Sequence, residues 1–291
     1  MANFRSPHPL SPAPSPSHKR ASLVPLDSVA RNFLRSWLGE PPGPELLALH
    51  HALIHPVPGL WGDDLRTPRS VVLVREGDNQ LEAFGAGEPE PALGWLAGHG
   101  RAVSLISPPR WRYRVGGWVG AFKWAAVETW SLAERNRLPF VPVSQRRAIA
   151  ARPLTRADAE AFAAIAPAWA LGSWGSFAAL IEHGAAFGVP RGDGFLALAW
   201  ILNESARFDA VGVFTAPKFR RLGLARAAAT ALMSQIVYRR RKTPVWSAAA
   251  ENAGSHALAL ALGFSMRSTQ PLLRWRPRPG AFTRARQVSR Q

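Results

Sequence analysis

The segment from Val211 to Arg226 constrains the fold more than any other part of the sequence. It reads VGVFTAPKFRRLGLAR: an apolar run, a proline, a loop with arginines and glycine, and then helix-forming residues. Where a strand passes through such a loop into a helix, the first helical amides lack partners and point toward one spot. Gly223 lets the backbone approach a ligand closely, and the helix dipole together with Arg220 and Arg221 supplies positive potential. The segment therefore predicts an anion site of the kind that binds phosphate groups.

The loop pattern R-x-x-G-x-[GA] is weak evidence when taken alone. Arginine supplies 32 of the 36 Lys and Arg residues, so this spacing can arise by chance, and an ordinary loop entering a helix is the alternative. The surrounding elements decide between the two readings. From residue 148 the hydrophobic periodicity and turn signals predict the order β-α-α-β-β-β-α-β-α-β. Thr155 and Asp158 have the spacing of a capping box at the start of the first helix. The expected strands are 148–153, 186–189, 195–202, 208–215, 245–249 and 272–275, and the expected helices are 155–165, 173–183, 224–240 and 255–262.

A second motif follows the loop by about thirty residues. It comprises ENAGS at 251–255 and LALALGF at 258–264. Together with the loop, its spacing resembles the cofactor-binding half of the GNAT superfamily of acyl-CoA N-acyltransferases, over about Ala148 to Arg276. SWGSF at 173–177 and P-x-W at 244–246 are similar to two-domain GNAT proteins related to zwittermicin-A-resistance acetyltransferases. The resemblance implies an α/β (α+β) chain with a GNAT fold over 146–278 and a smaller α/β N-terminal domain.

The resemblance implies an acetyl-CoA-dependent N-acetyltransferase that transfers an acetyl group to a primary amine of a small molecule. Main-chain groups of Val213 and Thr215 are expected to bind the pantetheine arm, and the basic last third of the chain attracts the anionic cofactor. The residues implied in binding acetyl-CoA are Val213, Thr215, Arg220, Arg221, Leu222, Gly223, Leu224, Ala225, Arg226, Asn252 and Ser255.

Catalysis needs a donor for the carbonyl oxygen and a group that takes the proton of the amine. A main-chain N–H at Val213 or Phe214 is the expected donor. Asp209 and Glu251 are the only acidic residues from 205 to the end, so they are the candidate bases, with plain surface charge as the alternative.

The departing sulfur distinguishes this sequence from the common GNAT pattern. Ala259 stands where many GNAT enzymes have a tyrosine. Ser255, His256 or water are candidate acids, and a thiolate can also leave without one. Asn252 and Ser255 also suit the N-terminus of a helix, where they would act as caps.

Acceptor recognition is the least constrained part of the prediction. Trp174 and Phe177 are candidates for the wall of an amine pocket, with ordinary core packing as the alternative. Neither His183 nor the pair His50–His51 has the spacing of metal ligands, so no metal is expected.

The N-terminal part divides into two regions. Residues 1–26 are rich in Ser and Pro and are expected to be a disordered tail. Residues 27–145 predict an α/β domain with a link near Pro139 and Pro142. Within Arg110–Trp130, the spacing of Trp118, Val119 and Phe122 predicts a helix packed against the core. The alternatives for this aromatic and basic stretch are stacking on nucleic-acid bases and contact with a membrane surface. The expected helices of this domain are 28–38, 45–54 and 91–97, and its expected strands are 70–74, 81–84 and 102–106.

Charge and composition set the remaining expectations. The absence of cysteine excludes a disulfide framework, and the longest apolar run, 195–202, is too short to span a membrane. We expect a cytoplasmic protein without membrane contact, as a monomer or a homodimer. The net charge of +17 lies mainly in the last third, which ends in a basic tail at 279–291. The alternatives are an inactive acyl-CoA-binding module and, less favoured, a nucleic-acid-binding protein, for which no reader motif is present.

Overall fold

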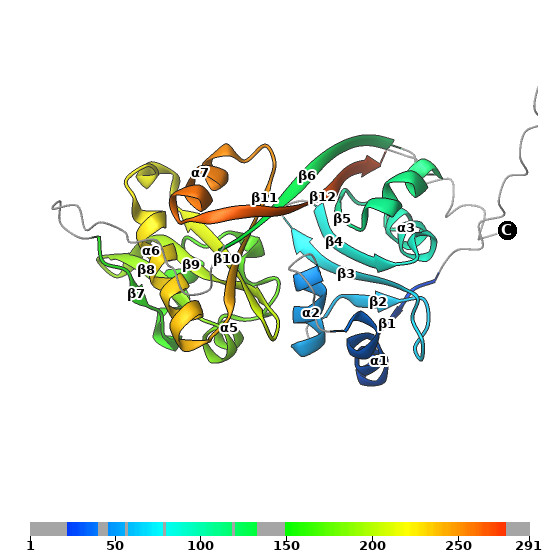
Figure 1. Ribbon diagram of the computed structural model, residues 1–291, viewed down its shortest axis with the longest axis horizontal. Helices are drawn as coiled ribbons and strands as arrows, with labels where there is room; N and C mark the ends of the chain where they lie inside the picture. The colour runs from blue at the N-terminus through cyan, green and yellow to red at the C-terminus, as the bar shows by residue number, and fades with distance from the viewer. Residues whose placement is uncertain are drawn as a thin grey trace, which may run out of the picture.

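One continuous sheet organises both lobes of the molecule (Figure 1). The computed structural model describes residues 22–39, 46–55, 58–77, 80–117, 120–132 and 149–277. In these ranges, twelve strands pair in the order β1-β2-β3-β4-β5-β12-β6-β11-β10-β9-β8-β7. The chain is therefore a mixed α/β protein, as the sequence predicts.

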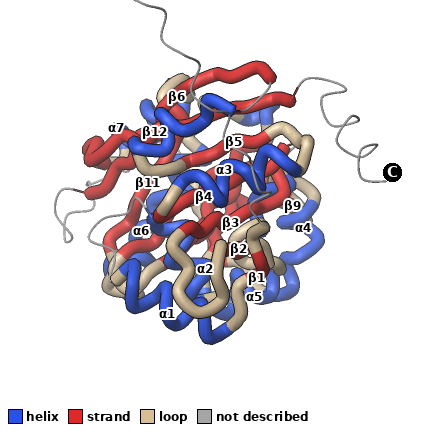
Figure 2. Tube along the Cα trace, turned by 90° about the vertical axis from the view of Figure 1, so that its right-hand side faces the viewer, coloured by secondary structure: helices blue, strands red, loops and turns tan. Residues whose placement is uncertain are grey.

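The N-terminal lobe holds the first five strands of the chain. Its elements are β1 (Val24–Pro25), α1 (Ser28–Leu38), α2 (Leu47–Ile54), β2 (Leu60–Gly62), β3 (Ser70–Gly77), β4 (Gln80–Gly87), α3 (Pro89–Gly98), β5 (Val103–Ile106) and the 3-10 segment η2 (Pro109–Gly117). Strands β2, β3 and β4 are antiparallel, and β5 runs parallel to β4. Figure 2 looks onto this lobe and shows α3 lying over the strands β3 and β4.

The C-terminal lobe holds the strands β7 to β11. Its elements are β7 (Arg152–Pro153), η3 (Arg156–Asp158), α4 (Ala159–Ala163), η4 (Ala168–Leu171), α5 (Phe177–His183), β8 (Ala186–Arg191), β9 (Gly194–Glu204), β10 (Phe208–Thr215), η5 (Pro217–Phe219), α6 (Leu224–Ser234), the π-helical turn η6 (Gln235–Arg239), β11 (Thr243–Ala249) and α7 (Ala253–Ala261). Helix α6 packs on β8, β9 and β10. Its apolar side joins a core that includes the fully buried Trp200 and Leu198.

Two long strands tie the lobes together. Strand β6 (Gly120–Leu132) and strand β12 (Phe264–Pro277) pair with each other along nearly their whole length. The C-terminal part of β6 also pairs with β11, and the C-terminal part of β12 pairs with β5. Each lobe thus completes its sheet with a strand from the other half of the sequence, and Figure 1 shows both strands crossing between the lobes.

Local sequence signals explain several element boundaries. Asp158 accepts hydrogen bonds from the backbone N–H and the hydroxyl of Thr155, at 2.8 and 3.1 Å, which confirms the predicted capping box. Asp27 accepts from the N–H of Ala30 at 2.9 Å and begins α1 at the predicted residue. Such caps stabilise a helix end by about 1 kcal/mol each, because they satisfy amides that the helix leaves unpaired.

The structure differs from the sequence prediction in the region 110–130. A 3-10 segment and the strand β6 replace the predicted helix, and Phe122 is 41% exposed. Trp118 and Val119 lie outside the described residues. A short helical pattern of apolar residues is overridden here because β6 gains two strand partners from the other half of the chain.

The predicted tails and link lie largely outside the described ranges, which exclude 1–21, 133–148 and 278–291. At the end of the segment predicted as a tail, Leu23 and Leu26 are buried and β1 pairs with β2, so residues 22–26 pack with the lobe. No helix within the described ranges has the length and hydrophobicity of a membrane span.

Candidate functional site

The parallel strands β10 and β11 separate partway along their length. They pair only from Phe208 to Ala210 against Thr243 to Val245. Beyond that point β10 continues to Thr215 with only β9 as its partner, while β11 pairs with β6. The result is a gap in the sheet, bordered by residues 211–215 on one side and 246–249 on the other.

The backbone of β10 presents polar groups to this gap. Ala216 donates its N–H to Leu196 O at 3.1 Å, on the β9 side. In an antiparallel ladder the N–H and C=O groups of successive residues alternate between the two sides. Val213 and Thr215 therefore direct their main-chain groups away from β9 and into the gap. These are the two residues that the GNAT resemblance implied for contact with the pantetheine arm.

The loop after β10 leaves a row of amides unpaired by the helix. In the described chain, the first helical bond of α6 runs from Ala227 N–H to Gly223 O at 3.1 Å. Gly223 is the N-cap at φ +79°, and Arg221 also has a positive φ of 64°. The left-handed backbone at these positions turns the chain so that consecutive N–H groups face the same direction, which is the geometry of an anion-binding nest.

Arginine side chains add positive charge around this loop, and there is open space next to Gly223. Arg220 and Arg221 are exposed, and Arg220 Nε donates to Thr215 O at 3.4 Å. The Nε of Arg226, in the first turn of α6, is buried and has no hydrogen-bond partner among the described residues. A Cβ on Gly223 would meet only Ile149 Cδ1, at 3.8 Å. An anion at this corner would find both donors and room, and Leu222, Leu224 and Ala225 contribute their backbone to it.

Helix α7 borders the other side of the gap. Asn252 caps it, accepting the N–H of Ser255 at 3.1 Å, which confirms the capping interpretation. The Ser255 hydroxyl accepts from Trp246 Nε1 at 2.8 Å, which leaves its own proton available for donation. Asn252, Ser255 and Trp246 all line the gap, whereas His256 is turned toward Trp130, with ring centroids 5.5 Å apart.

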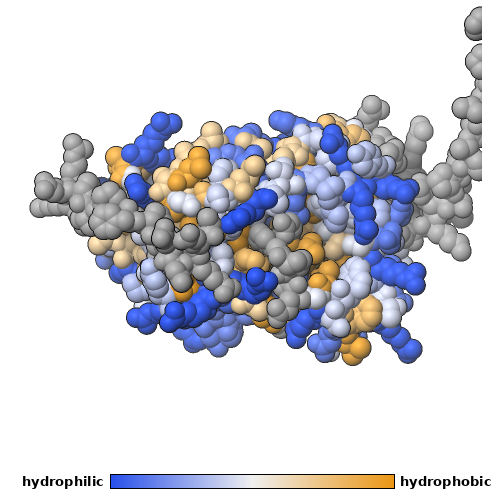
Figure 3. All heavy atoms as spheres, viewed as in Figure 1, coloured by the Kyte–Doolittle hydropathy of each residue, from blue (hydrophilic) through white to orange (hydrophobic). Residues whose placement is uncertain are grey.

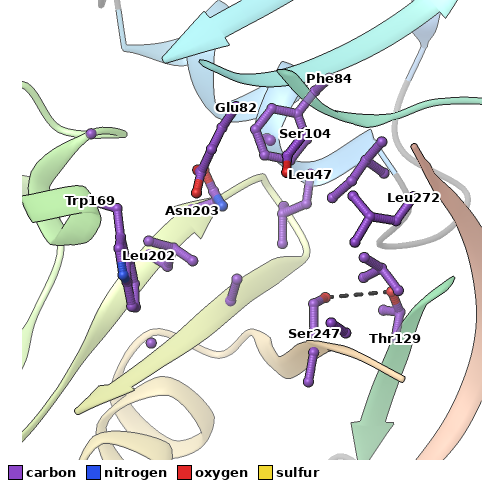
Figure 4. Close-up of a pocket in the computed structure, with 18 of the residues that line it drawn as sticks. Leu47, Glu82, Phe84, Ser104, Thr129, Trp169, Leu202, Asn203, Ser247 and Leu272 are labelled. Atoms are coloured by element: carbon purple, nitrogen blue, oxygen red, sulfur yellow. Dashed lines mark hydrogen bonds between the residues drawn. The ribbon is translucent and has the colours of Figure 1, made fainter. Parts of the chain in front are cut away.

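A cavity of about 600 Å³ extends from this gap to the N-terminal lobe (Figure 4). We call it the interlobe cavity. Its C-terminal wall includes Val211–Val213 and Trp246–Ala249, and Thr129 Oγ1 of β6 lies 3.4 Å from Ser247 Oγ. The N-terminal wall includes Leu47, Arg75, Glu82, Phe84, Ser104 and Ile106. Figure 3 shows hydrophilic side chains over much of the outer edge of one face, with apolar side chains visible between the lobes.

Asp209 is not placed for the predicted role of base. Its side chain is fully buried and does not line the interlobe cavity. Its carboxylate accepts from Arg240 Nε at 2.5 Å and lies 3.1 Å from Lys242 Nζ. Burial raises the pKa of Asp209, and both cations oppose that rise. The two ion pairs hold the start of β10 against the residues before β11, so the structure gives Asp209 a structural role.

Glu251 lies at the rim and does not line the interlobe cavity. Its side chain is half exposed and forms an ion pair with Arg274, which does line the cavity. Its backbone N–H and Arg274 hold the pKa of Glu251 below its ordinary value. The carboxylates that line the cavity are instead Glu76 and Glu82 of the N-terminal lobe.

Trp174 and Phe177 are core residues, contrary to their predicted place in an acceptor pocket. Trp174 is 4% exposed and donates its indole N–H to Ile201 O at 2.6 Å. Phe177 packs on Phe162 with ring centroids 4.8 Å apart. Neither lines the interlobe cavity, while Trp169 does.

No sequence motif predicted the cavity residues of the N-terminal lobe. Arg75, Glu82 and Ser104 belong to no motif, and they meet the C-terminal strands only because the lobes share a sheet. Glu82 and Ser104 stand at the more exposed positions of alternating strands, whereas Arg75 follows the continuous apolar run 71–74. Among the described residues, no three His, Asp or Glu side chains gather as metal ligands would.

Comparisons with known proteins agree with this geometry. Residues 147–272 match the family model of the GNAT acetyltransferases, so this segment forms a GNAT domain, and the match supports an acyl-transfer role. No curated protein matches the chain.

Several solved structures share the fold over most of the chain. A GCN5-related N-acetyltransferase-like protein from Streptococcus suis 89/1591 superposes with a TM-score of 0.64 at 17% identity, covering 85% of this chain and all of that one. A GNAT-family acetyltransferase from Colwellia psychrerythraea gives 0.56 at 14% identity, covering 87% of this chain and 99% of that chain. A tandem GNAT protein of the clavulanic acid biosynthesis pathway gives 0.55 at 12% identity, covering 87% and 97%.

Proposed function

We propose that this chain is an acetyl-CoA-dependent N-acetyltransferase that transfers an acetyl group to a primary amine of a small molecule. The observation that carries the proposal is the gap between β10 and β11, together with the unpaired amides at the start of α6. The GNAT match of residues 147–272 supports the same activity. We extend the proposal to the two-domain type of GNAT protein, on the resemblance of 173–177 and 244–246.

The residues around the gap fit acetyl-CoA as cosubstrate. Main-chain groups of Val213 and Thr215 would hydrogen-bond the pantetheine arm, which lies along a strand edge that has no other strand partner. The pyrophosphate would bind at the amides of residues 221–226, where the helix dipole and Arg226 add positive potential. When bound, acetyl-CoA supplies an activated acyl group.

The surrounding residues supply the remaining requirements of acyl transfer. The N–H of Val213, directed into the gap, is the donor we propose for the carbonyl oxygen. Ser255 is positioned to give its hydroxyl proton to the departing sulfur, because its oxygen already accepts from Trp246. The amine must reach the gap as the neutral form, and Glu82 on the opposite wall and water are the routes that we propose for its proton.

A charge placed in the loop tests the proposal. Gly223→Glu puts a carboxylate where the pyrophosphate would lie, and we expect acetyl-CoA affinity to fall by at least about 100-fold, or about 2.7 kcal/mol. Isothermal titration calorimetry measures the affinity. Gly192→Glu is the matched control: Gly192 also has a positive φ, of 54°, and open space around it, but it lies in the β8–β9 turn.

Two outcomes would contradict the proposal in different ways. Equal affinity of the wild type and Gly223→Glu would show that the loop does not bind the cofactor. Tight binding of acetyl-CoA without single-turnover acetyl transfer to any member of a broad amine panel would instead indicate an inactive acyl-CoA-binding module.

A further inference from the structure

A buried arginine forms part of the N-terminal wall of the interlobe cavity. Arg75 lies on β3, is 8% exposed and lines the cavity. A charged side chain at this depth is costly unless its donors are satisfied, because water no longer solvates it. The hydrogen-bond partners of Arg75 therefore show whether other residues of the protein satisfy its N–H donors.

A network of buried polar groups fixes the position of this guanidinium. Arg75 Nη2 donates to Asn203 Oδ1 at 3.0 Å, and the same oxygen accepts from Ser173 Oγ at 2.9 Å. Ser173 O lies 2.9 Å from His51 Nε2, and His51 Nδ1 accepts the N–H of Glu204 at 3.0 Å. His51 is thereby held as the Nε2–H tautomer, and elements of both lobes hold Asn203 and Arg75 in place.

Arg75 keeps unused hydrogen-bonding capacity. A guanidinium has five N–H donors, and among the described residues its hydrogen bond goes to Asn203 alone. Its Nε is buried without a partner. The Phe84 ring lies 5.2 Å from Arg75 Cζ and gives a cation–π contact, which uses no N–H group.

The charges nearby leave Arg75 positive. Glu82 lies opposite it in the β3–β4 ladder, so both side chains are on one face of the sheet. Burial lowers the pKa of Arg75 to about 10, and Glu82 opposes this shift. Arg75 is therefore a cation at neutral pH. The other charged groups of the cavity are already paired, Glu76 with Arg101 and Arg274 with Glu251.

We propose that Arg75 binds a carboxylate of the acyl acceptor, so that the acceptor is an amine that also carries a carboxylate, of the size of an amino acid. This inference rests on the proposed acetyl transfer. Arg75 and the β10–β11 gap line one cavity of about 600 Å³, so a molecule whose amine is at the gap can place a second group at Arg75. Arginine binds a planar carboxylate through paired N–H groups, and the hydrogen bond to Asn203 uses one of the five N–H donors of Arg75.

Equilibrium binding tests this assignment without requiring catalysis. The probes are the α-amino acids, β-alanine and γ-aminobutyrate, each compared with its uncharged amide, followed by tryptophan fluorescence because Trp169 and Trp246 line the cavity. We expect at least one carboxylate to bind the wild type at least 10-fold more tightly than its amide. In Arg75→Met the ratio should fall to about 1, and in Arg66→Met, a control at an exposed site of the same lobe, it should not change.

The outcomes that overturn the assignment are equally defined. They are equal affinity for acid and amide, no binding of any carboxylated amine, or an acid preference that survives in Arg75→Met. If Arg75→Met does not fold, the wild-type ratio and Arg75→Lys decide, because the lysine variant should keep a weaker acid preference. O-Phosphoethanolamine is a further probe, and tighter binding of it than of every carboxylate would also overturn the assignment.

Acetyl transfer to the same pairs separates this inference from the proposed function. Transfer at equal kcat/KM to acids and amides would support an N-acetyltransferase and overturn the role of Arg75. Acid-selective binding that depends on Arg75, without any transfer, would contradict the proposed function and support the anion site. The expected result is transfer with kcat/KM at least 10-fold higher for the acid than for its amide.

Discussion

The two lobes repeat one arrangement of elements and differ at the place where a ligand would bind. In each, three antiparallel strands are followed by a helix and a fourth, parallel strand: β2–β3–β4, α3 and β5 in one lobe, and β8–β9–β10, α6 and β11 in the other. Each lobe then sends its last strand into the other. The whole sheet is accordingly symmetric about the β6–β12 pair (Figure 1).

The connection between the third strand and the helix differs most. In the C-terminal lobe, residues 216–223 form a loop with arginines before α6. In the N-terminal lobe, Glu88 alone separates β4 from α3, which begins with Pro89 and Glu90. A proline has no N–H to donate, and acidic residues repel an anion. The β4–α3 connection therefore lacks the N–H donors and the positive potential that the loop before α6 provides.

The space next to the strand is also filled in the N-terminal lobe. Trp111 of η2 is fully buried and donates its indole N–H to Gly87 O at 2.9 Å. A Cβ on Gly85 would lie 2.4 Å from two carbons of the Trp111 ring, so glycine is needed for the ring to pack on β4. The C-terminal lobe thus has an open gap for a ligand, while the N-terminal lobe closes the equivalent space and serves as a wall of the cavity.

Truncating the Trp111 ring tests whether its packing closes the N-terminal lobe, and we expect this change to reduce stability more than the other substitutions below. Trp111→Ala should lower the free energy of unfolding by about 3–5 kcal/mol, because a buried aromatic ring leaves a cavity. Tyr113→Ala, two residues away and 84% exposed, is the control and should change stability by no more than about 0.5 kcal/mol. Urea denaturation measures both. A loss below about 1 kcal/mol for Trp111→Ala would mean that the N-terminal lobe also tolerates an open gap.

The next largest effect concerns how the open lobe is held together. Asp209→Asn should cost about 3 kcal/mol, because Arg240 and Lys242 then lose a buried carboxylate partner and keep the carboxylate of Glu204. Asp193→Asn, in the exposed β8–β9 turn, is the control and should be close to neutral. Chemical denaturation measures stability, and acetyl transfer is assayed in parallel. A stable Asp209→Asn protein with normal acetyl-CoA binding but no transfer would restore Asp209 as a candidate base.

The stability of the interface between the lobes, where His51 lies, should depend on pH. Burial is the main reason that the pKa of His51 is lowered from 6.5 to about 3, and Arg75 and His55 add to the shift. Below pH 6.5 the unfolded chain binds a proton that the folded chain does not. The free energy of unfolding therefore decreases as the pH is lowered, by about 1.4 kcal/mol per pH unit, or about 2 kcal/mol in total at pH 5.

The matched variants isolate this contribution. His51→Gln should lose stability less steeply than the wild type between pH 7 and 5, whereas the exposed control His99→Gln should follow the wild type. Urea denaturation across this pH range measures the slopes. Identical slopes in all three proteins would show that His51 is not the residue that couples pH to the stability of this interface.

The smallest expected effect is at the rim of the open lobe. Glu251→Gln should cost less than about 1 kcal/mol, since its ion pair with Arg274 is partly exposed and screened. Because Glu251 does not line the cavity, we also expect kcat/KM for acetyl transfer to change by less than about threefold, or 0.65 kcal/mol. Arg156→Gln removes another exposed ion pair, with Glu182, and is the control. A large loss of kcat with unchanged stability would assign Glu251 to proton transfer.

Local signals in the sequence predicted several backbone features around the candidate site. Three such features depend on neighbouring residues only, so sequence patterns can indicate them without tertiary information. They are the glycine at position 223, which has a positive φ, the Asn252 cap and the Thr155–Asp158 capping box. The acceptor side was predicted poorly. Trp174 is an aromatic residue at a helical spacing, and nothing local distinguishes a pocket wall from core packing.

Long-range pairing decided the rest. Local patterns were enough to predict the order of elements in the C-terminal lobe and the loop that begins α6, because capping, turn and periodicity signals act over a few residues. The exchange of β6 and β12 between the lobes, the shared cavity of Arg75 and the β10–β11 gap, and the enclosure of Asp209 by Arg240 and Lys242 became visible only in the folded chain. These contacts join residues far apart in the chain, and their energies depend on packing partners that no local pattern specifies.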